Sequence, residues 1–196
     1  MTTEEYIREL LARPRQYATY FNLGLDREHD EVGAAADLLE SLRGKDRIPV
    51  LERSLAARPR GEDPPDCDAL TPSGNRIAIE VTELVDRESI RRQVRTGCAP
   101  PCEYSKELFL ERLEERLVAK RRKRSDLKGG PYGICILVIH TDEMLLTHED
   151  CLSWLCGHEV ASHEPWDRVY LLFSYSPRYS PENPSDGGGL PYLRIA

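Results

Sequence analysis

Apolar positions along the chain change several times between a helical spacing and a strict alternation, and these changes predict the order of the elements. Apolar residues recur every three or four positions over residues 26–43, which is typical of one face of a helix. Further helices are expected over residues 3–12, 103–124 and 148–157. Residues 48–57 are apolar enough for a short helix or a turn that closes against the core.

Alternating and continuous apolar runs predict the strands. They are expected at residues 66–70, 76–82, 132–140 and 169–175 and, as an edge strand, at 190–195. Thr71-Pro72-Ser73-Gly74-Asn75 supplies turn chemistry, so the first two strands should form a β-hairpin. The second hairpin strand has two unlike faces: Ile77, Ile79 and Val81 on one, and Ala78, Glu80 and Thr82 on the other.

This order mixes an antiparallel hairpin with a crossover through a long helix, so we predict an α/β fold with a mixed β-sheet flanked by helices. A chain of 196 residues suits one well-packed domain, and no repeat or linker divides it. We therefore expect a single domain over 1–196, with its core at about 26–175. Residues 176–196 read as a loop-rich extension, because Pro, Ser and Gly dominate up to residue 189.

Composition narrows the class of protein. A net charge of −7 and a pI near 5.4 argue against a uniformly basic, nucleic-acid-coating protein but leave room for a local basic groove. The longest apolar run, residues 134–139, is far below the roughly 20 residues that cross a bilayer. We expect a cytoplasmic protein with no membrane partner. The six cysteines are expected to be free, packed thiols, with a structural zinc at Cys151, Cys156 and His158 as the alternative.

Two acids stand out at the predicted hairpin. Asp66 begins its first strand and Glu80 lies late in its second, so the hairpin should bring them together. A carboxylate on an inner strand is costly unless it is paired, protonated or bound to a metal. With the carbonyl of Val81, these residues offer hard oxygen ligands suited to Mg²⁺ or Mn²⁺. Such an ion could activate water and stabilise charge on a phosphodiester. Pairing with a nearby basic residue is the alternative.

Pro65-Asp66, a gap of 13 residues and then Glu80-Val81-Thr82 resembles the PD-(D/E)XK nuclease superfamily, whose fold is called restriction-endonuclease-like. The core of that family is a helix, a hairpin that carries the acids, a crossover helix and another strand, and the predicted order agrees over about residues 26–140. The resemblance implies metal-dependent hydrolysis of DNA or RNA, with Asp66 and Glu80 matching the two metal-binding acids.

The chain departs from that family at its lysine, which falls where this sequence has Thr82. A hydroxyl cannot supply the positive charge that helps orient water and stabilise the phosphate. Some members that the chain resembles carry the lysine on a neighbouring helix. Lys120 lies on the core-facing side of the helix predicted over 103–124, with Lys123 behind it, so Lys120 is the expected replacement. The alternative is a lysine that extends past apolar surface into solvent.

Further charged residues could complete the site. In the family that the chain resembles, acids on the helix before the hairpin often do so, and Glu31 is favoured slightly over Glu40; a solvated helix face is the alternative. A dense basic run is expected to bind the phosphates of nucleic acid: Arg121, Arg122, Lys123, Arg124 and Lys128. The run equally suits the carboxyl end of a helix.

Two functions therefore stay open at this stage. The Asp66–Glu80 pair favours an active nuclease, whereas Thr82 and the acidic net charge favour a catalytically impaired nuclease-fold protein. The latter would serve as a nucleic-acid-binding or protein-interaction module. Many nucleases that the chain resembles pair up to cut both strands, so a homodimer is a further expectation.

Overall fold

The computed structural model describes residues 27–196 except for residues 43, 60, 98, 161–163 and 175–188. The side chains of residues 27, 28 and 45 also lie outside the description. The helix expected over 3–12 and most of the Pro-, Ser- and Gly-rich stretch after residue 175 fall outside the described residues, so neither expectation is tested.

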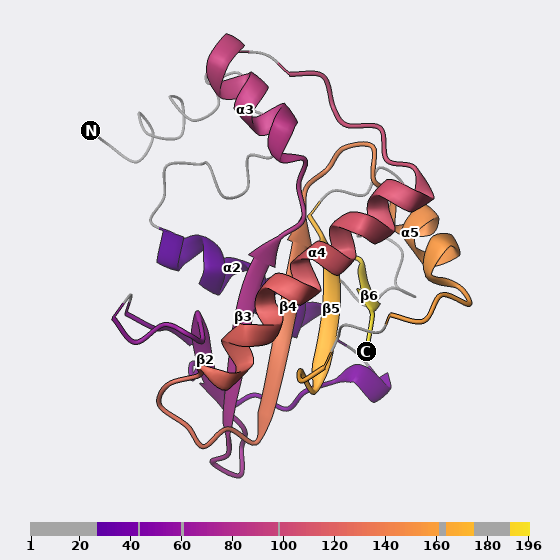
Figure 1. Cartoon of the computed structure of the whole chain (residues 1–196). Coiled ribbons are helices and arrows are strands. Elements are labelled where there is room, and N and C mark those ends of the chain that lie inside the picture. The colour runs from indigo at the N-terminus through magenta and orange to yellow at the C-terminus, as the bar shows by residue number, and fades with distance from the viewer. Residues whose placement is uncertain (1–26, 43, 60, 98, 161–163, 175–188) are drawn as a thin grey trace.

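Six strands form a single sheet, and helices cover both of its faces (Figure 1). The strands are β1 (Ala56–Ala57), β2 (Cys67–Leu70), β3 (Arg76–Glu83), β4 (Ile134–Thr141), β5 (Arg168–Phe173) and β6 (Tyr192–Arg194). The described helices are α2 (Arg27–Ser41), α3 (Arg87–Thr96), α4 (Lys106–Ser125) and α5 (His148–Leu155), with a 3₁₀ turn at Gly44–Asp46. The strands lie in sequence order, with β3–β4 and β4–β5 parallel and the other neighbours antiparallel. The predicted α/β fold with a mixed sheet is therefore confirmed.

The hairpin of β2 and β3 forms where turn chemistry interrupts the alternation. The Thr71 amide donates to the Asn75 carbonyl over 2.9 Å, and Gly74 adopts a φ of +83°, a conformation that glycine accommodates without strain. Cys67 pairs with Ile79, so the antiparallel register brings the residue before Cys67 beside the residue after Ile79. This register places Asp66 next to Glu80.

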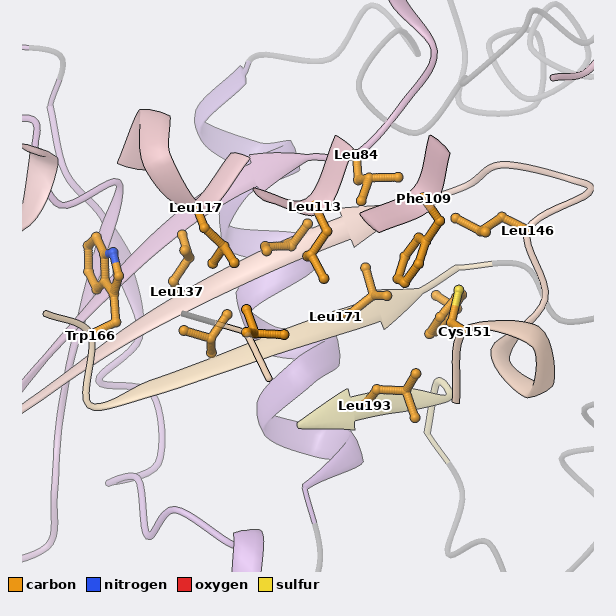
Figure 2. Packing of buried hydrophobic residues seen from close by; sticks show 14 of the residues in the cluster. Leu84, Phe109, Leu113, Leu117, Leu137, Leu146, Cys151, Trp166, Leu171 and Leu193 are labelled. Atoms are coloured by element: carbon orange, nitrogen blue, oxygen red, sulfur yellow. The ribbon is translucent and has the colours of Figure 1, made fainter. Parts of the chain in front are cut away.

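The alternation along β3 sorts its side chains into two hydrophobic layers. Ile77 and Ile79 face α2, and Leu38 of this helix and Leu42 directly after it are almost fully buried. The opposite face meets α4 through Phe109, Leu113 and Leu117, each 0% exposed. Figure 2 shows these α4 side chains turned toward the sheet, where Leu137 and Leu171 lie. Burial of one such side chain contributes about 1.5–3 kcal/mol, so α4 is firmly anchored over β3 and β4.

One segment was predicted in part and one helix was missed. Residues 48–57, expected as a short helix or a turn, contain a turn at residues 52–53 and end in the short strand β1, because the end of this segment pairs with the edge of β2. Helix α3 was not predicted: none of its residues is buried, so it lacks the apolar stripe on which the prediction depended. Its ends do carry signals, since the Asp86 side chain accepts a hydrogen bond from the Ser89 amide and Gly97 has a φ of +73°.

Among the described helices, none is long and apolar enough to cross a membrane.

Candidate metal centre

Three carboxylates meet at the start of the hairpin. Asp63, Asp66 and Glu80 each offer an oxygen, and these three oxygens all lie within 4.8 Å of one another. Asp66 comes directly before β2, and Glu80 lies in the middle of β3 on the face toward α4. Asp63 belongs to the Pro-rich loop before β2 and was not among the residues predicted for the site. This is the one such group of three potential metal ligands within the described part of the chain.

The backbone holds two of these acids in place. The Val81 amide donates to Asp66 Oδ2 over 2.7 Å, so the second strand fixes the side chain that precedes the first. The Arg58 amide also donates to the Asp66 carbonyl over 2.9 Å. The loop that carries Asp63 is tied to the chain after α4, because the Lys128 amide donates to the Pro64 carbonyl over 2.8 Å.

Lys120 reaches the same point from α4. Its Nζ donates to Glu80 Oε1 over 2.6 Å and to the Val81 carbonyl over 2.8 Å, and lies 3.9 Å from Asp66 Oδ2. The three groups that the sequence analysis assigned to a metal ion are therefore the groups that surround this ammonium. Lys120 sits one turn beyond the buried Leu117, which explains why its side chain points toward the sheet.

The Glu80 carboxylate lies in an environment that is unusual for a charged group. The residue is 0% exposed, and its Oε2 has no hydrogen-bond partner among the described residues. Burial raises the pKa of Glu80, as does the neighbouring Asp66 carboxylate, while the Lys120 ammonium opposes this rise. A cation beside Glu80 is thus needed to keep the buried carboxylate ionised.

The donor set fits a divalent cation. Carboxylate oxygens are the ligands that Mg²⁺ and Mn²⁺ prefer, and Glu80 Oε2 offers a lone pair that no described group uses. Asp63 Oδ1 also has no hydrogen-bond partner in the described part of the chain, although Lys123 Nζ lies 3.8 Å away. Asp63, Asp66 and Glu80 are thus the residues that could hold such an ion, and Lys120 is the cation already beside them.

The other residues predicted for the site lie around this centre or away from it. Thr82 is half-buried on the α4-facing side of β3, two positions beyond Glu80. Glu31 is buried at 8% exposure and helps raise the pKa of Cys67, after burial and Asp66, but it is outside the group of three carboxylates. Glu40, its alternative, is exposed.

The predicted basic run divides into two parts. Arg121, Arg122 and Lys128 are exposed, whereas Lys123 and Arg124 are half-buried. Lys123 lies by Asp63, and Lys128 Nζ donates to the Gly61 carbonyl over 3.3 Å. Two of the five cations thus contact the loop that carries Asp63. Arg121 and Arg122 are exposed on α4, and no ion pair with either is found among the described residues.

The described cysteines are free thiols, and burial raises the pKa of Cys67, Cys135 and Cys151. Burial of Cys67, Cys135 and Cys151 matches the packed thiols that were expected, whereas Cys102 is half-buried and Cys156 is exposed, so the expectation was wrong for Cys156. Cys98 lies outside the described residues. No group of three ligands that includes a cysteine occurs among the described residues, so nothing described supports the zinc alternative.

No family model matches this chain, and neither the curated proteins nor the solved structures that were compared include a match.

Proposed function

We propose that this protein is a metal-dependent phosphodiesterase, a nuclease that acts on DNA or RNA, built on a restriction-endonuclease-like core. The single observation that supports the proposal is the convergence of Asp63, Asp66 and Glu80 within 4.8 Å, with a lysine ammonium 2.6 Å from Glu80. Acids that can hold a metal ion, with a cation beside them, are a combination that can promote phosphodiester hydrolysis.

Each residue has a distinct part in this proposal. A hard divalent cation supplies Lewis acidity, which lowers the pKa of a neighbouring water and offsets negative charge on a phosphate. Asp66, fixed by the Val81 amide, and Glu80, fixed by β3, provide ligands of defined position. Asp63 provides a third ligand, and with a 27% exposed side chain it is the acid nearest to solvent.

Lys120 supplies the positive charge that Thr82 lacks. Its ammonium donates to Glu80 Oε1, beside the carboxylates that would hold the ion, and can stabilise the charge that develops on a phosphate. The side chain is 15% exposed, so the ammonium is partly desolvated and its field is stronger than it would be in water. Lys123 and Lys128, next to the loop that carries Asp63, are placed to bind phosphates beside the cleaved bond.

A second candidate function rests on the same lysine. Because Lys120 already neutralises Glu80 and contacts the Val81 carbonyl, the cluster is electrostatically satisfied in part without an added ion. This observation favours a catalytically impaired nuclease-fold protein, in which the pair is structural and the basic residues serve nucleic-acid or protein binding.

Two measurements distinguish the active nuclease from the impaired protein. Calorimetric titration with Mn²⁺ and Mg²⁺ measures cation binding, and incubation with supercoiled plasmid, single-stranded DNA and RNA measures cleavage. We expect the wild type to bind the cation and cleave, and Asp63→Asn to bind at least about tenfold more weakly, a change of about 1.4 kcal/mol. Glu80→Ala should abolish both cation binding and cleavage. Glu111→Gln, an exposed carboxylate elsewhere on α4, is the control.

Asp63→Asn matters most in this experiment, because the Asp63 side chain is partly exposed and its loss should leave the fold intact. A wild type that binds neither cation would refute the metal-dependent activity. Cation binding without cleavage of any substrate would favour the impaired protein.

A further inference from the structure

A groove of about 490 Å³ lies between the first turns of α3 and the middle of α4. Four arginines line it: Arg87 and Arg91 from α3, and Arg112 and Arg116 from α4. Its acidic lining residues are Asp86, Glu88 and Glu115. Seven of its eight lining residues are charged and the eighth is Ala119, which makes an ion a better ligand for it than an apolar molecule.

Only two of the four arginines in the groove are paired with a carboxylate of the described residues. Arg112 pairs with Glu115 at 2.8 Å, and Arg91 lies 3.5 Å from Glu88, so the charges of these two arginines are offset within their own helices. Asp86 is engaged as the cap of α3 through the Ser89 amide.

Arg87 and Arg116 are the two arginines of the groove that form no ion pair with a described carboxylate. No carboxylate of the described residues lies within 4.0 Å of either guanidinium. The pKa of Arg116 is lowered, first by burial and then by the positive charge of Arg87. Two like charges that face each other across a partly buried groove are stabilised by an anion between them.

The groove continues the candidate metal centre along α4. Arg116 precedes Lys120 by one helical turn, a distance of about 6 Å along the axis. A nucleic-acid strand advances about 3.4 Å per nucleotide, so the two positions correspond to phosphates about two nucleotides apart.

We propose that the α3–α4 groove binds a backbone phosphate of nucleic acid through Arg87 and Arg116, about two nucleotides from the bond at the carboxylates. The proposal rests on the proposed function, because it takes the cluster of Asp63, Asp66 and Glu80 as the point of reference. Guanidinium groups suit this task since their planar donors match two phosphate oxygens at once. Helix α3 has no buried residue, and in this proposal its first turn serves to supply Arg87 to the groove.

Binding at several salt concentrations tests the groove. Fluorescence anisotropy with labelled 20-nucleotide single-stranded and duplex DNA, in EDTA so that nothing is cleaved, would compare wild type with Arg87→Gln/Arg116→Gln. We expect the double variant to bind at least tenfold more weakly. The slope of log K against log salt on duplex should become shallower by about 0.9–1.8, the release expected for one or two phosphates.

The matched control is Arg92→Gln/Arg95→Gln, which removes the same charge from exposed positions of α3 outside the groove. It should bind nearly as well as the wild type. The proposal is overturned if the groove variant binds as tightly as this control. It is also overturned if the wild type binds no oligonucleotide, or if titration with inorganic phosphate shows Arg87- and Arg116-dependent binding that oligonucleotides do not compete with.

Cleavage assays show whether the groove proposal and the nuclease proposal fail independently of each other. Loss of binding in the groove variant, with a wild type that cuts no substrate, would support the groove and refute the nuclease. Cleavage by the wild type that the groove variant matches in rate and affinity would support the nuclease and refute the groove.

Discussion

At the scale of single residues, the chemistry of this protein centres on Glu80 and Lys120. A buried ion pair gains strength from its low-dielectric surroundings, but each partner depends on the other, because removing one leaves an uncompensated charge. Glu80 is 0% exposed and Lys120 is its closest cation at 2.6 Å. A divalent cation bound at Glu80 would provide part of the charge compensation that the Lys120 ammonium provides in this structure.

Lys120→Met should therefore destabilise the protein by about 3–5 kcal/mol, while the double variant Glu80→Gln/Lys120→Met recovers part of this loss because no charge stays buried. Thermal unfolding with and without 5 mM Mn²⁺ gives the decisive comparison. We expect Mn²⁺ to raise the Tm of Lys120→Met more than that of the wild type, since the ion replaces the lost positive charge.

Lys106→Met, which removes an exposed lysine from the first turn of α4, is the control and should leave stability within about 0.5 kcal/mol of the wild type. Equal Mn²⁺ responses in wild type and Lys120→Met would contradict the idea that the ion compensates the charge of Glu80 when the ammonium is removed.

The sequence pointed to Glu80 because an acid interrupts an apolar, alternating strand, and to Lys120 because it extends a core-facing helical stripe. Both arguments are local and periodic. Asp63 carries no such signal. Its position depends on a loop whose path is held by a hydrogen bond from Lys128, 64 residues later, to Pro64, a long-range contact that local patterning does not encode.

At the scale of elements, β4 is enclosed on both edges and on both faces. Neighbouring strands pair with it on both sides, and α2 and α4 cover its two faces, so seven of its eight residues are buried. His140 at the carboxyl end of this strand is 0% exposed, and burial lowers its pKa to about 3. Its imidazole therefore stays neutral in the folded protein well below the pH at which it ionises in an unfolded chain.

This shift predicts a loss of stability in acid. The unfolded state takes up a proton below its pKa of about 6.5 and the folded state does not, so this contribution is complete above pH 6.5 and is lost as the pH falls toward 3. Between pH 7.5 and pH 5 it amounts to about 2 kcal/mol.

Urea unfolding of the wild type and of His140→Gln at both pH values measures it. The variant should lose about 2 kcal/mol less than the wild type between the two pH values, whatever its stability at pH 7.5. The exposed His158→Gln is the control and should follow the wild type. An equal loss in His140→Gln would show that the imidazole ionises inside the fold.

The elements also show the limits of periodic patterning. Helix α4 was predicted to begin at Glu103, but Ser105 caps it and Lys106 begins it. Helix α3 has fixed ends but no apolar stripe, so it was missed. An apolar stripe reports burial against a core, and a helix that only borders a groove does not need one.

At the scale of the whole molecule, one sheet joins two hydrophobic layers. Every central strand contributes alternate residues to both, as Ile136 does to the α2 side and Leu137 to the α4 side. Strands shared in this way couple the layers, because neither can open without exposing the strands on which the other packs. Both tryptophans lie in the α4-side layer or against it, which makes them reporters for one face.

Leu38→Ala tests this coupling from the opposite face. The side chain is 1% exposed, so its truncation should cost about 2–5 kcal/mol. Urea unfolding should shift by the same amount whether it is followed by far-UV circular dichroism or by the fluorescence of Trp154 and Trp166. Val118→Ala, truncating a 57% exposed side chain, should change little by either probe. A tryptophan transition that Leu38→Ala leaves in place would mean that the layers unfold separately.

Local sequence patterns were enough to predict the mixed α/β class, the hairpin that brings Asp66 to Glu80, and the helix face that carries Lys120. These features follow from the side-chain periods of 3.6 residues in a helix and 2 residues in a strand, which are visible within a short segment. Three features became visible only in the folded chain: Asp63 joins the carboxylates, Lys120 contacts the predicted ligand oxygens, and the first turns of α3 and the middle of α4 line one groove. The physical reason is that these contacts join residues far apart in sequence, and their geometry depends on how the layers pack and where the loops cross.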